Sequence, residues 1–432
     1  MKRGGKQSAE QSWHTHLKWL RPGLGVKRWL LLLGLGVGLL SLGGAVVLRE
    51  FYPLSMHFYY LTLQFVPRQI RAILLIVAGI SSLGIGLWGL NRAMLEPFIE
   101  NAQNSIPEVL YDYRRRGRGP KIVVIGGGHG QATVLRGLKQ YTTNITAIVT
   151  VADDGGSSGR LRRELGILPP GDFRNCLAAL ADDESLVTRL FQYRFASGKD
   201  LGGHSFGNLF ISAMSSITGS FETGLEESSR VLAVEGRVLP STLATVTLCA
   251  DVAQNGAPAA RICGESEIPQ PSGRIQRVFL DPPDPRAYPL TVQAILEADL
   301  VVIGPGSLYT SIMPNLLVGE IAEALRTIKV PRVYICNVAT QVGETEEYTA
   351  ADHLQAIEEH LGRGIVSVAV INTYIPTREL PPDVAWVRPD LRSRDDMRVV
   401  STNLVDETLG WRHKSDQLAQ IILNILKQSD WE

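Results

Sequence analysis

Three glycine-rich loops in this chain each follow an apolar, β-branched run, and such an arrangement can bind phosphate. The runs are 121–125, 145–151 and 300–303, and the loops after them are 126–130, 153–159 and 304–307. Glycine directly after a strand lets backbone N–H groups approach an anion closely, and the N-terminus of a following helix favours negative charge. We therefore expect a ligand that carries phosphates, such as a nucleotide.

The first loop consists of Gly126, Gly127, Gly128, His129 and Gly130. It departs from the dinucleotide-binding pattern because Gln131 stands where G-x-G-x-x-G requires glycine, although the strand before the loop and the helix after it both fit. This context predicts a phosphate-binding loop. Two roles stay open for His129, contact with a phosphate or a capping position at the start of the helix.

The second loop begins with two adjacent carboxylates, Asp153 and Asp154. One acid at this distance from a first glycine loop commonly binds a ribose hydroxyl. Alternatively, Asp154 could ligate Mg²⁺ as a single carboxylate while water completes the octahedral shell, which makes Mg²⁺ the candidate cofactor. The loop adds backbone donors and hydroxyls from Gly155, Gly156, Ser157 and Ser158.

A proline- and glycine-containing turn at 169–171 opens the next predicted helix. Asp172 is its candidate N-cap, and Arg174 and Asn175 fall in its first turn. A cation at a helix N-terminus opposes the helix dipole, so we expect Arg174 to have another partner, such as Asp153 or a ligand phosphate.

The remaining candidate ligand residues lie further along the chain: His204, Asn208, Gly304, Gly306, Ser307, Asn337 and Arg412. The loop at 304–307 lacks the lysine of a Walker A loop, which argues against an ATPase. The segment after Asn337 holds Thr340 and Gln341, whose polar groups suit a base or sugar hydroxyls. Arg412 and His413 precede the last predicted helix, where they could reach a phosphate or lie on the surface.

The elements that must position these residues follow a strand–loop–helix pattern from residue 120 onward. The runs 300–303, 333–336 and 365–371 are almost continuously apolar, as parallel strands buried on both faces are. Ligands of such sheets bind beyond the carboxyl ends of the strands. The predicted fold class is α/β, a Rossmann-like doubly wound and mostly parallel sheet over 120–432. The four cysteines lack C-x-x-C spacing, so we expect reduced core cysteines.

The N-terminal quarter has a different composition. Segments 29–48 and 72–90 carry no charge and are long enough to cross a hydrocarbon core of about 30 Å. Basic residues crowd 1–28 and the predicted linker 91–119, which places both termini inside and 49–71 outside. The expectation is a two-helix transmembrane hairpin at the inner (cytoplasmic) membrane with the 120–432 domain in the cytoplasm. The balance of 43 basic and 43 acidic residues predicts no nucleic-acid partner.

Long stretches of the chain carry a family resemblance, among them KIVVIGGG, ADDGGSSGRLR, GHSFGNLFI and IGPGSLYTSI. On these residues the chain resembles the YvcK-type gluconeogenesis factors, a branch of the CofD-like superfamily that also holds the 2-phospho-L-lactate transferases. The likeness covers about 120–360 and weakens toward 430. His129 replaces the usual threonine of that family's first loop, and the predicted spans make this chain a membrane-anchored variant.

The resemblance implies a Rossmann-like fold and a nucleotide-sugar ligand of the UDP-N-acetylglucosamine type. It also implies a non-catalytic regulatory role in cell shape and cell-wall precursor control during gluconeogenic growth. Regulators of cell-wall synthesis and a second copy of the chain are the expected partners. The alternative is a Mg²⁺-dependent transferase that acts on a nucleoside-diphosphate-linked donor. An NAD-dependent oxidoreductase is a weaker third reading, because no proton donor or hydride site is evident.

Overall fold

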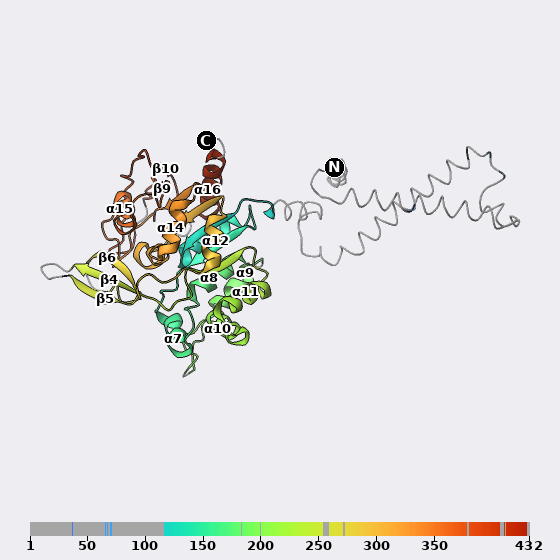
Figure 1. The fold of residues 1–432 in the computed structure, drawn as a ribbon, viewed down its shortest axis with the longest axis horizontal. Helices are drawn as coiled ribbons and strands as arrows, with labels where there is room; N and C mark the ends of the chain where they lie inside the picture. The colour runs from blue at the N-terminus through green and yellow to red at the C-terminus, as the bar shows by residue number, and fades with distance from the viewer. Residues whose placement is uncertain are drawn as a thin grey trace, which may run out of the picture. The chain divides into compact units, whose positions relative to one another are not determined.

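The computed structural model describes residues 116–182, 184–198, 200–253, 259–270, 273–377, 380–406, 410 and 412–429, together with residues 37, 65, 67 and 70. The chain divides into two compact units, 1–115 and 116–432. Every helix and strand named below belongs to the second unit (Figure 1).

A parallel sheet of seven strands forms the centre of this unit in the described part of the chain, in the order β10-β9-β8-β7-β1-β2-β3. Its central strands are apolar on both faces and fully buried, which explains their near-continuous runs of Val, Ile and Leu. The mostly parallel α/β fold predicted from the sequence is therefore confirmed. The strands are β1 (Ile122–Gly126), β2 (Ile145–Val149), β3 (Arg237–Pro240), β7 (Leu300–Ile303), β8 (Arg332–Ile335), β9 (Val368–Asn372) and β10 (Arg398–Thr402).

Helices connect the strands, and several pack on one another: α6 contacts α8 and α16, α10 contacts α11, and α12 contacts α14. Helix α15 begins with a capping box between Thr349 and Asp352, which fixes its start. The helices are α6 (Gly128–Leu138), α7 (Gly156–Leu165), α8 (Gly171–Leu180), α9 (Glu184–Gln192), α10 (Phe206–Thr218), α11 (Phe221–Val231), α12 (Pro289–Leu296), η3 (Leu308–Ile312), α13 (Met313–Leu316), α14 (Gly319–Thr327), α15 (Ala350–Leu361) and α16 (Ser415–Ser429).

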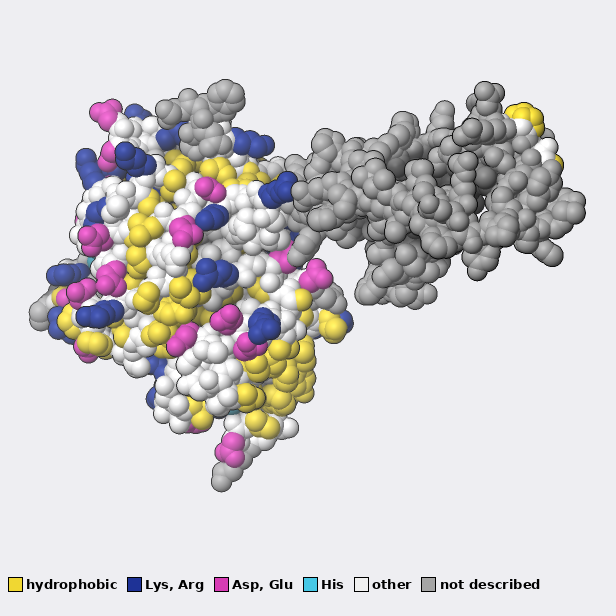
Figure 2. Space-filling view, turned by 45° about the vertical axis from the view of Figure 1, so that its right-hand side comes forward, with side chains coloured by type: hydrophobic (Ala, Val, Ile, Leu, Met, Phe, Trp, Pro, Cys, Tyr) yellow, Lys and Arg dark blue, Asp and Glu magenta, His cyan; other side chains and the backbone are white. Residues whose placement is uncertain are grey.

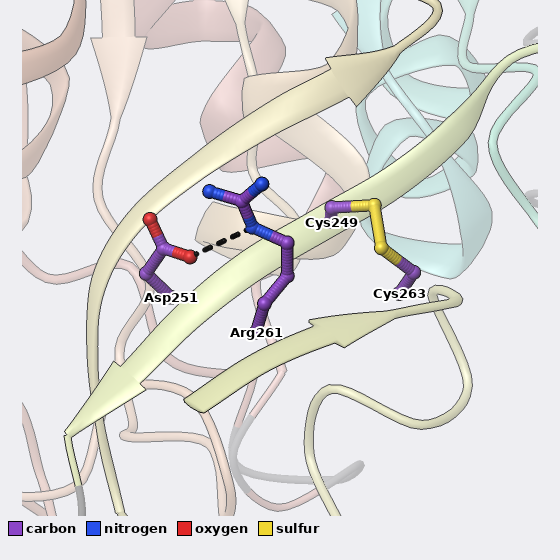
Figure 3. Close-up of a disulfide and its surroundings, with 4 residues drawn as sticks. All are labelled: Cys249, Asp251, Arg261 and Cys263. Atoms are coloured by element: carbon purple, nitrogen blue, oxygen red, sulfur yellow. Dashed lines mark hydrogen bonds and ion pairs between the residues drawn. A yellow bond between two sulfur atoms is a disulfide. The ribbon is translucent and has the colours of Figure 1, made fainter. Parts of the chain in front are cut away.

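A second, antiparallel sheet consists of β5 (Ala260–Cys263), β4 (Thr247–Ala253) and β6 (Arg274–Asp281), in the order β5-β4-β6. Cys249 on β4 and Cys263 on β5 lie directly opposite each other and form a disulfide (Figure 3). The expectation of four reduced cysteines is thus wrong for this pair, because only the hairpin register places the two side chains together. Cys176 and Cys336 are free and buried, as predicted.

The predicted location at the inner membrane requires correction. No helix among the described residues is both long enough and apolar enough to cross a bilayer. The predicted spans 29–48 and 72–90 lie outside the described residues except for residue 37. On the face of unit 116–432 seen in Figure 2, acidic and basic side chains are interspersed.

Candidate functional site

Strands β1 and β7 mark the switch point of the central sheet. From β1 the chain proceeds outward through β2 to β3, whereas β7 leads through β8 and β9 to β10 on the other side. Their following loops meet closely: a Cβ on Gly130 would clash with the carbonyl oxygen of Pro305, so only glycine permits this approach. Ligands of doubly wound sheets bind in the crevice at such a point.

A cavity of about 300 Å³ opens at this point. It is formed by the start of α6, the loop after β7, the loop after β8 and the segment before α16. The predicted residues that line it are His129, Gly130, Gly306, Ser307, Asn337, Thr340, Gln341, Arg412 and His413. Pro305, which also lines the cavity, lies within the predicted loop 304–307. Thr133, Val338 and Ala339 were not predicted from the sequence; of these, Thr133 lies one helical turn after His129 and was open to inference from helical spacing.

The cavity has a positive electrostatic environment. His129 is exposed, and its pKa is lowered by partial burial and then by the charges of Arg412, Arg174 and Arg136. A short hairpin holds Arg412: Asp406 N–H donates to the Arg412 carbonyl at 2.8 Å, and His413 forms a bridge with Val405. Arg412 is exposed, and none of the ion pairs in the described part of the chain involves it. An anion is the ligand that suits this set of groups.

Asn337 fixes the shape of the cavity. Its Nδ2 donates to the Gly306 carbonyl at 2.8 Å, and its Oδ1 accepts from the Gly306 N–H at 3.2 Å. The asparagine after β8 therefore holds the glycine loop after β7 in place. Glu344 supports the same region, because it accepts hydrogen bonds from Tyr309 N–H at 3.2 Å, Thr310 Oγ1 at 2.8 Å and Gln341 Nε2 at 2.7 Å.

The first part of the glycine loop after β1 faces the protein. A Cβ on Gly127 would lie 2.5 Å from Asp172 Oδ2, and the Asp172 carboxyl accepts the Gly128 N–H. The prediction of Asp172 as an N-cap is therefore wrong: α8 has Pro170 as its N-cap residue, without a side-chain cap. Desolvation, together with the charge of Asp153, raises the pKa of Asp172 to about 7.

The departure of Gln131 from the dinucleotide pattern also has a structural cause. Its buried side chain donates from Nε2 to the carbonyls of Val124 at 2.8 Å and Ile148 at 2.9 Å, which joins β1 to β2. Its Oε1 accepts from Cys176 Sγ at 3.3 Å. Glycine at this position would leave two buried carbonyls without these donors.

Six predicted ligand residues form a buried network instead of lining the cavity: Ser157, Ser158, Arg174, Asn175, His204 and Asn208. Arg174 donates to Ser205 Oγ at 2.7 Å and to Asn175 Oδ1 at 3.1 Å, so these side chains and not the predicted Asp153 are its hydrogen-bond partners in the described region. Contact with a ligand phosphate stays a prediction. Ser157 Oγ is hydrogen-bonded to His204 Nδ1 at 2.9 Å and accepts from Asn208 Nδ2 at 3.0 Å. Arg174 Nε and Asn208 Oδ1 are buried without a partner in the described region.

A group of acidic side chains lies beside this network, and we call it the carboxylate group: Asp153, Asp154, Asp172, Glu265 and Glu344. Burial and then the other four charges raise the pKa of Glu265 to about 8. The sequence reading missed Glu265, because it stands in the irregular segment 253–290 outside any motif. Asp154 is held by the Ser266 N–H, which donates to its Oδ1 at 2.9 Å.

The donor set of the carboxylate group limits the metals that it could bind. Within the described ranges, no three His, Cys, Asp or Glu side chains are arranged to hold a metal ion. The carboxylates therefore fit only the loose mode of Mg²⁺ binding, in which one or two carboxylates contribute and water or ligand phosphate supplies the rest.

The chain is similar in sequence to one protein family and to several known proteins. Residues 122–405 match the family "2-phospho-L-lactate transferase CofD". A putative gluconeogenesis factor of Nostoc sp. is 47% identical over 94% of this chain and 91% of its own. The gluconeogenesis factor of Bacillus subtilis is 46% identical over 72% of this chain and 100% of its own.

A crystal structure from Bacillus halodurans agrees with these relatives. It superposes with a TM-score of 0.65 at 44% identity and covers 71% of this chain and 99% of that one. The family match over most of the chain and the sequence identities above 40% together show the family of this protein. The chain therefore belongs to the CofD family and, within it, to the gluconeogenesis factors.

Proposed function

We propose that this protein is a regulatory factor that binds a nucleotide sugar of the UDP-N-acetylglucosamine type in the cavity at the switch point. The observation that carries the proposal is the cavity itself. Backbone from two glycine loops, the exposed His129 and Arg412, and a polar loop from β8 converge on one space of about 300 Å³. This volume is at the lower end of small-molecule pockets and suits the diphosphate with part of its substituents.

The two ends of such a ligand match different parts of the lining. A diphosphate needs positive charge, which Arg412 supplies, and hydrogen-bond donors, which the backbone at Gly130 and the neutral imidazole of His129 supply. A base or sugar needs neutral polar partners, which Thr340 and Gln341 supply. In this account, occupancy of the cavity reports the nucleotide-sugar level to regulators of cell-wall synthesis during gluconeogenic growth and so affects cell shape. A homo-oligomer is the proposed assembly.

Calorimetry on the purified full-length protein tests the ligand. UDP-N-acetylglucosamine should bind with a micromolar Kd, about −8 kcal/mol. UDP should bind more weakly, and inorganic pyrophosphate more weakly again, because each lacks groups that the polar loop contacts. Absence of heat and of a thermal shift with every UDP-sugar, combined with clear binding of GDP or NAD, would overturn the proposal.

A second candidate is a Mg²⁺-dependent transferase that acts on a nucleoside-diphosphate-linked donor. The carboxylate group, with the unpartnered Arg174 Nε and Asn208 Oδ1 beside it, favours this reading. Mg²⁺ would neutralise charge that develops on a leaving phosphate, and Asp154 is the proposed ligand. Wild-type protein incubated with Mg²⁺, a lactate- or phosphoenolpyruvate-derived donor and an acceptor would then form a phosphodiester, detectable by mass spectrometry. We expect no such product.

A further inference from the structure

Strand β5 is held to the rest of the domain by its pairing with β4, by Ile262, which packs against the core, and by two side-chain links at its surface. It lies at the edge of its sheet, pairs with β4, and exposes Arg261 and Cys263. The Arg261 guanidinium forms an ion pair with Asp251 at 3.1 Å and lies 4.6 Å from the centre of the Phe279 ring. The covalent attachment is the disulfide from Cys263 to the buried Cys249 (Figure 3). Exposed ion pairs contribute little, so the disulfide is the strongest side-chain link.

The segment that follows Cys263 leads directly to the candidate site. Gly264 N–H donates to the Leu248 carbonyl at 2.8 Å, and Ser266 N–H donates to Asp154 Oδ1 at 2.9 Å. A Cβ on Gly264 would lie 2.8 Å from Asp154 Oδ2, so backbone and carboxylate are in close contact here. The disulfide therefore anchors, within three residues, the backbone donor that orients Asp154.

The same segment continues to the far side of the site. Glu265 enters the carboxylate group, and Pro269 lies so close to Gly343 that a Cβ there would clash with the proline backbone. Gly343 precedes Glu344, which holds Gln341 of the cavity lining. Displacement of 264–270 would thus disturb both the acidic loop after β2 and the polar loop after β8.

We propose that the Cys249–Cys263 pair is a redox modification site, at which a dithiol reductant releases the segment 264–270 and thereby weakens ligand binding in the cavity. Of the two residues Cys263 is exposed and Cys249 is buried, so Cys263 is the end of the disulfide at which a reductant would attack. Exposed disulfides are the labile and regulatory class.

The exchange balances in two steps. A thiolate of the dithiol attacks Cys263 Sγ, the bond between the two cysteines breaks, and Cys249 leaves as a thiolate that takes up a proton. The second thiol of the reductant, as its thiolate, then attacks the mixed disulfide and releases Cys263, which also takes up a proton. The reductant ends as a disulfide and the protein as two thiols, so two electrons and two protons pass to the protein.

Thiol labelling with mass spectrometry tests the modification itself on the full-length protein. Without reductant, Cys249 and Cys263 should resist an alkylating reagent, and after dithiothreitol both should be labelled. Hydrogen exchange should then accelerate at 260–270 and at 153–158, with the rest of the sheet unchanged. Labelling of both cysteines before reduction would overturn the disulfide, and unchanged exchange at 153–158 would overturn the release of the segment.

The effect on affinity rests on the proposed function and is measured separately. Reduction should weaken UDP-N-acetylglucosamine binding about tenfold, and Cys249→Ser with Cys263→Ser should show the weakened affinity with no further response to dithiothreitol. Ser266→Pro, which removes the N–H that holds Asp154, should reproduce the loss in the oxidised protein, whereas Ser266→Ala should not. Equal affinity before and after verified reduction would contradict the proposal. If neither the oxidised nor the reduced protein binds the nucleotide sugar but reduction still accelerates hydrogen exchange, only the proposed ligand is contradicted.

Discussion

The cavity and the carboxylate group lie at the same end of the central sheet but differ in charge and in internal bonding. The cavity presents the exposed side chains of His129 and Arg412, and the charges of Arg412, Arg174 and Arg136 act on His129. The carboxylate group and its neighbours are hydrogen-bonded within the protein, as Asp154 is to Ser266 and Arg174 to Ser205. An anionic ligand therefore meets unpaired groups in the cavity, whereas the carboxylate group is connected to the segment 264–270.

The largest effect is expected where the two glycine loops of the cavity touch. Gly130→Ala would place a methyl group against the Pro305 carbonyl and force the loops apart, so the free energy of unfolding should fall by about 2–3 kcal/mol. Gly306→Ala is the matched control, because its nearest neighbour, Ser311 Cβ, lies at an ordinary 3.5 Å. Urea denaturation compares the two. Equal stability of both variants would show that the close approach does not matter.

A slightly smaller loss should follow removal of the link between β1 and β2 beneath the cavity. Gln131→Leu leaves the carbonyls of Val124 and Ile148 without their donor, at a cost of about 2 kcal/mol. Gln355→Leu is the control, since this exposed side chain bonds Glu359 on its own helix and, within the described ranges, no buried carbonyl depends on it. If thermal melts show no difference between the variants, the buried amide is dispensable.

The carboxylate group should make the stability of the protein depend on pH. The folded-state pKa of Glu265, about 8, lies above its ordinary value of 4.5, so the folded protein binds the proton more tightly than the unfolded chain. The tighter binding of this proton stabilises the fold fully below pH 4.5, and the stabilisation is lost as the pH rises toward 8. Glu265→Gln should therefore stabilise the protein by about 1–2 kcal/mol at pH 8.5 and hardly at all at pH 4.5.

The control for this variant is Glu267→Gln, an exposed side chain two residues away. Melting temperatures measured across pH 4.5–8.5 should follow the wild-type values for Glu267→Gln. For Glu265→Gln they should lie above the wild-type values at high pH and approach them at low pH. A gain that is the same at every pH would mean that Glu265 is strained by packing and not by neighbouring charge.

The same contrast explains what could be predicted from the sequence. The strands 122–126 and 300–303 and their loops were predictable, because a long apolar run followed by glycines has few other meanings in an α/β chain. Gly130, Gly306 and Ser307 of the cavity come from those loops, whereas Asn337 and Arg412 were found because they flank a predicted strand and a predicted helix. Edge strands β3 and β10 were missed, since they are short and partly polar.

The carboxylate group and the disulfide could not be predicted, because both depend on contacts across more than one element. Glu265 comes near Asp154 because of the course that the chain takes after β5. Cys249 comes near Cys263 because of the register in which β4 pairs with β5. The expectation that Arg174 needs another partner is confirmed, but that partner, Ser205, is the N-cap residue of α10 and lies 31 residues away in the sequence. Such pairings are properties of the tertiary structure and leave no local pattern.

The central claim, that the cavity at the switch point binds a nucleotide sugar, is tested most directly by titration of UDP-N-acetylglucosamine into Arg412→Gln and Lys414→Gln. Both residues are exposed cations two positions apart, but only Arg412 lines the cavity. Loss of a charged hydrogen bond to phosphate costs about 1.5–3 kcal/mol, so Arg412→Gln should weaken binding at least tenfold while Lys414→Gln binds like wild type. Equal affinity for the two variants would contradict the account.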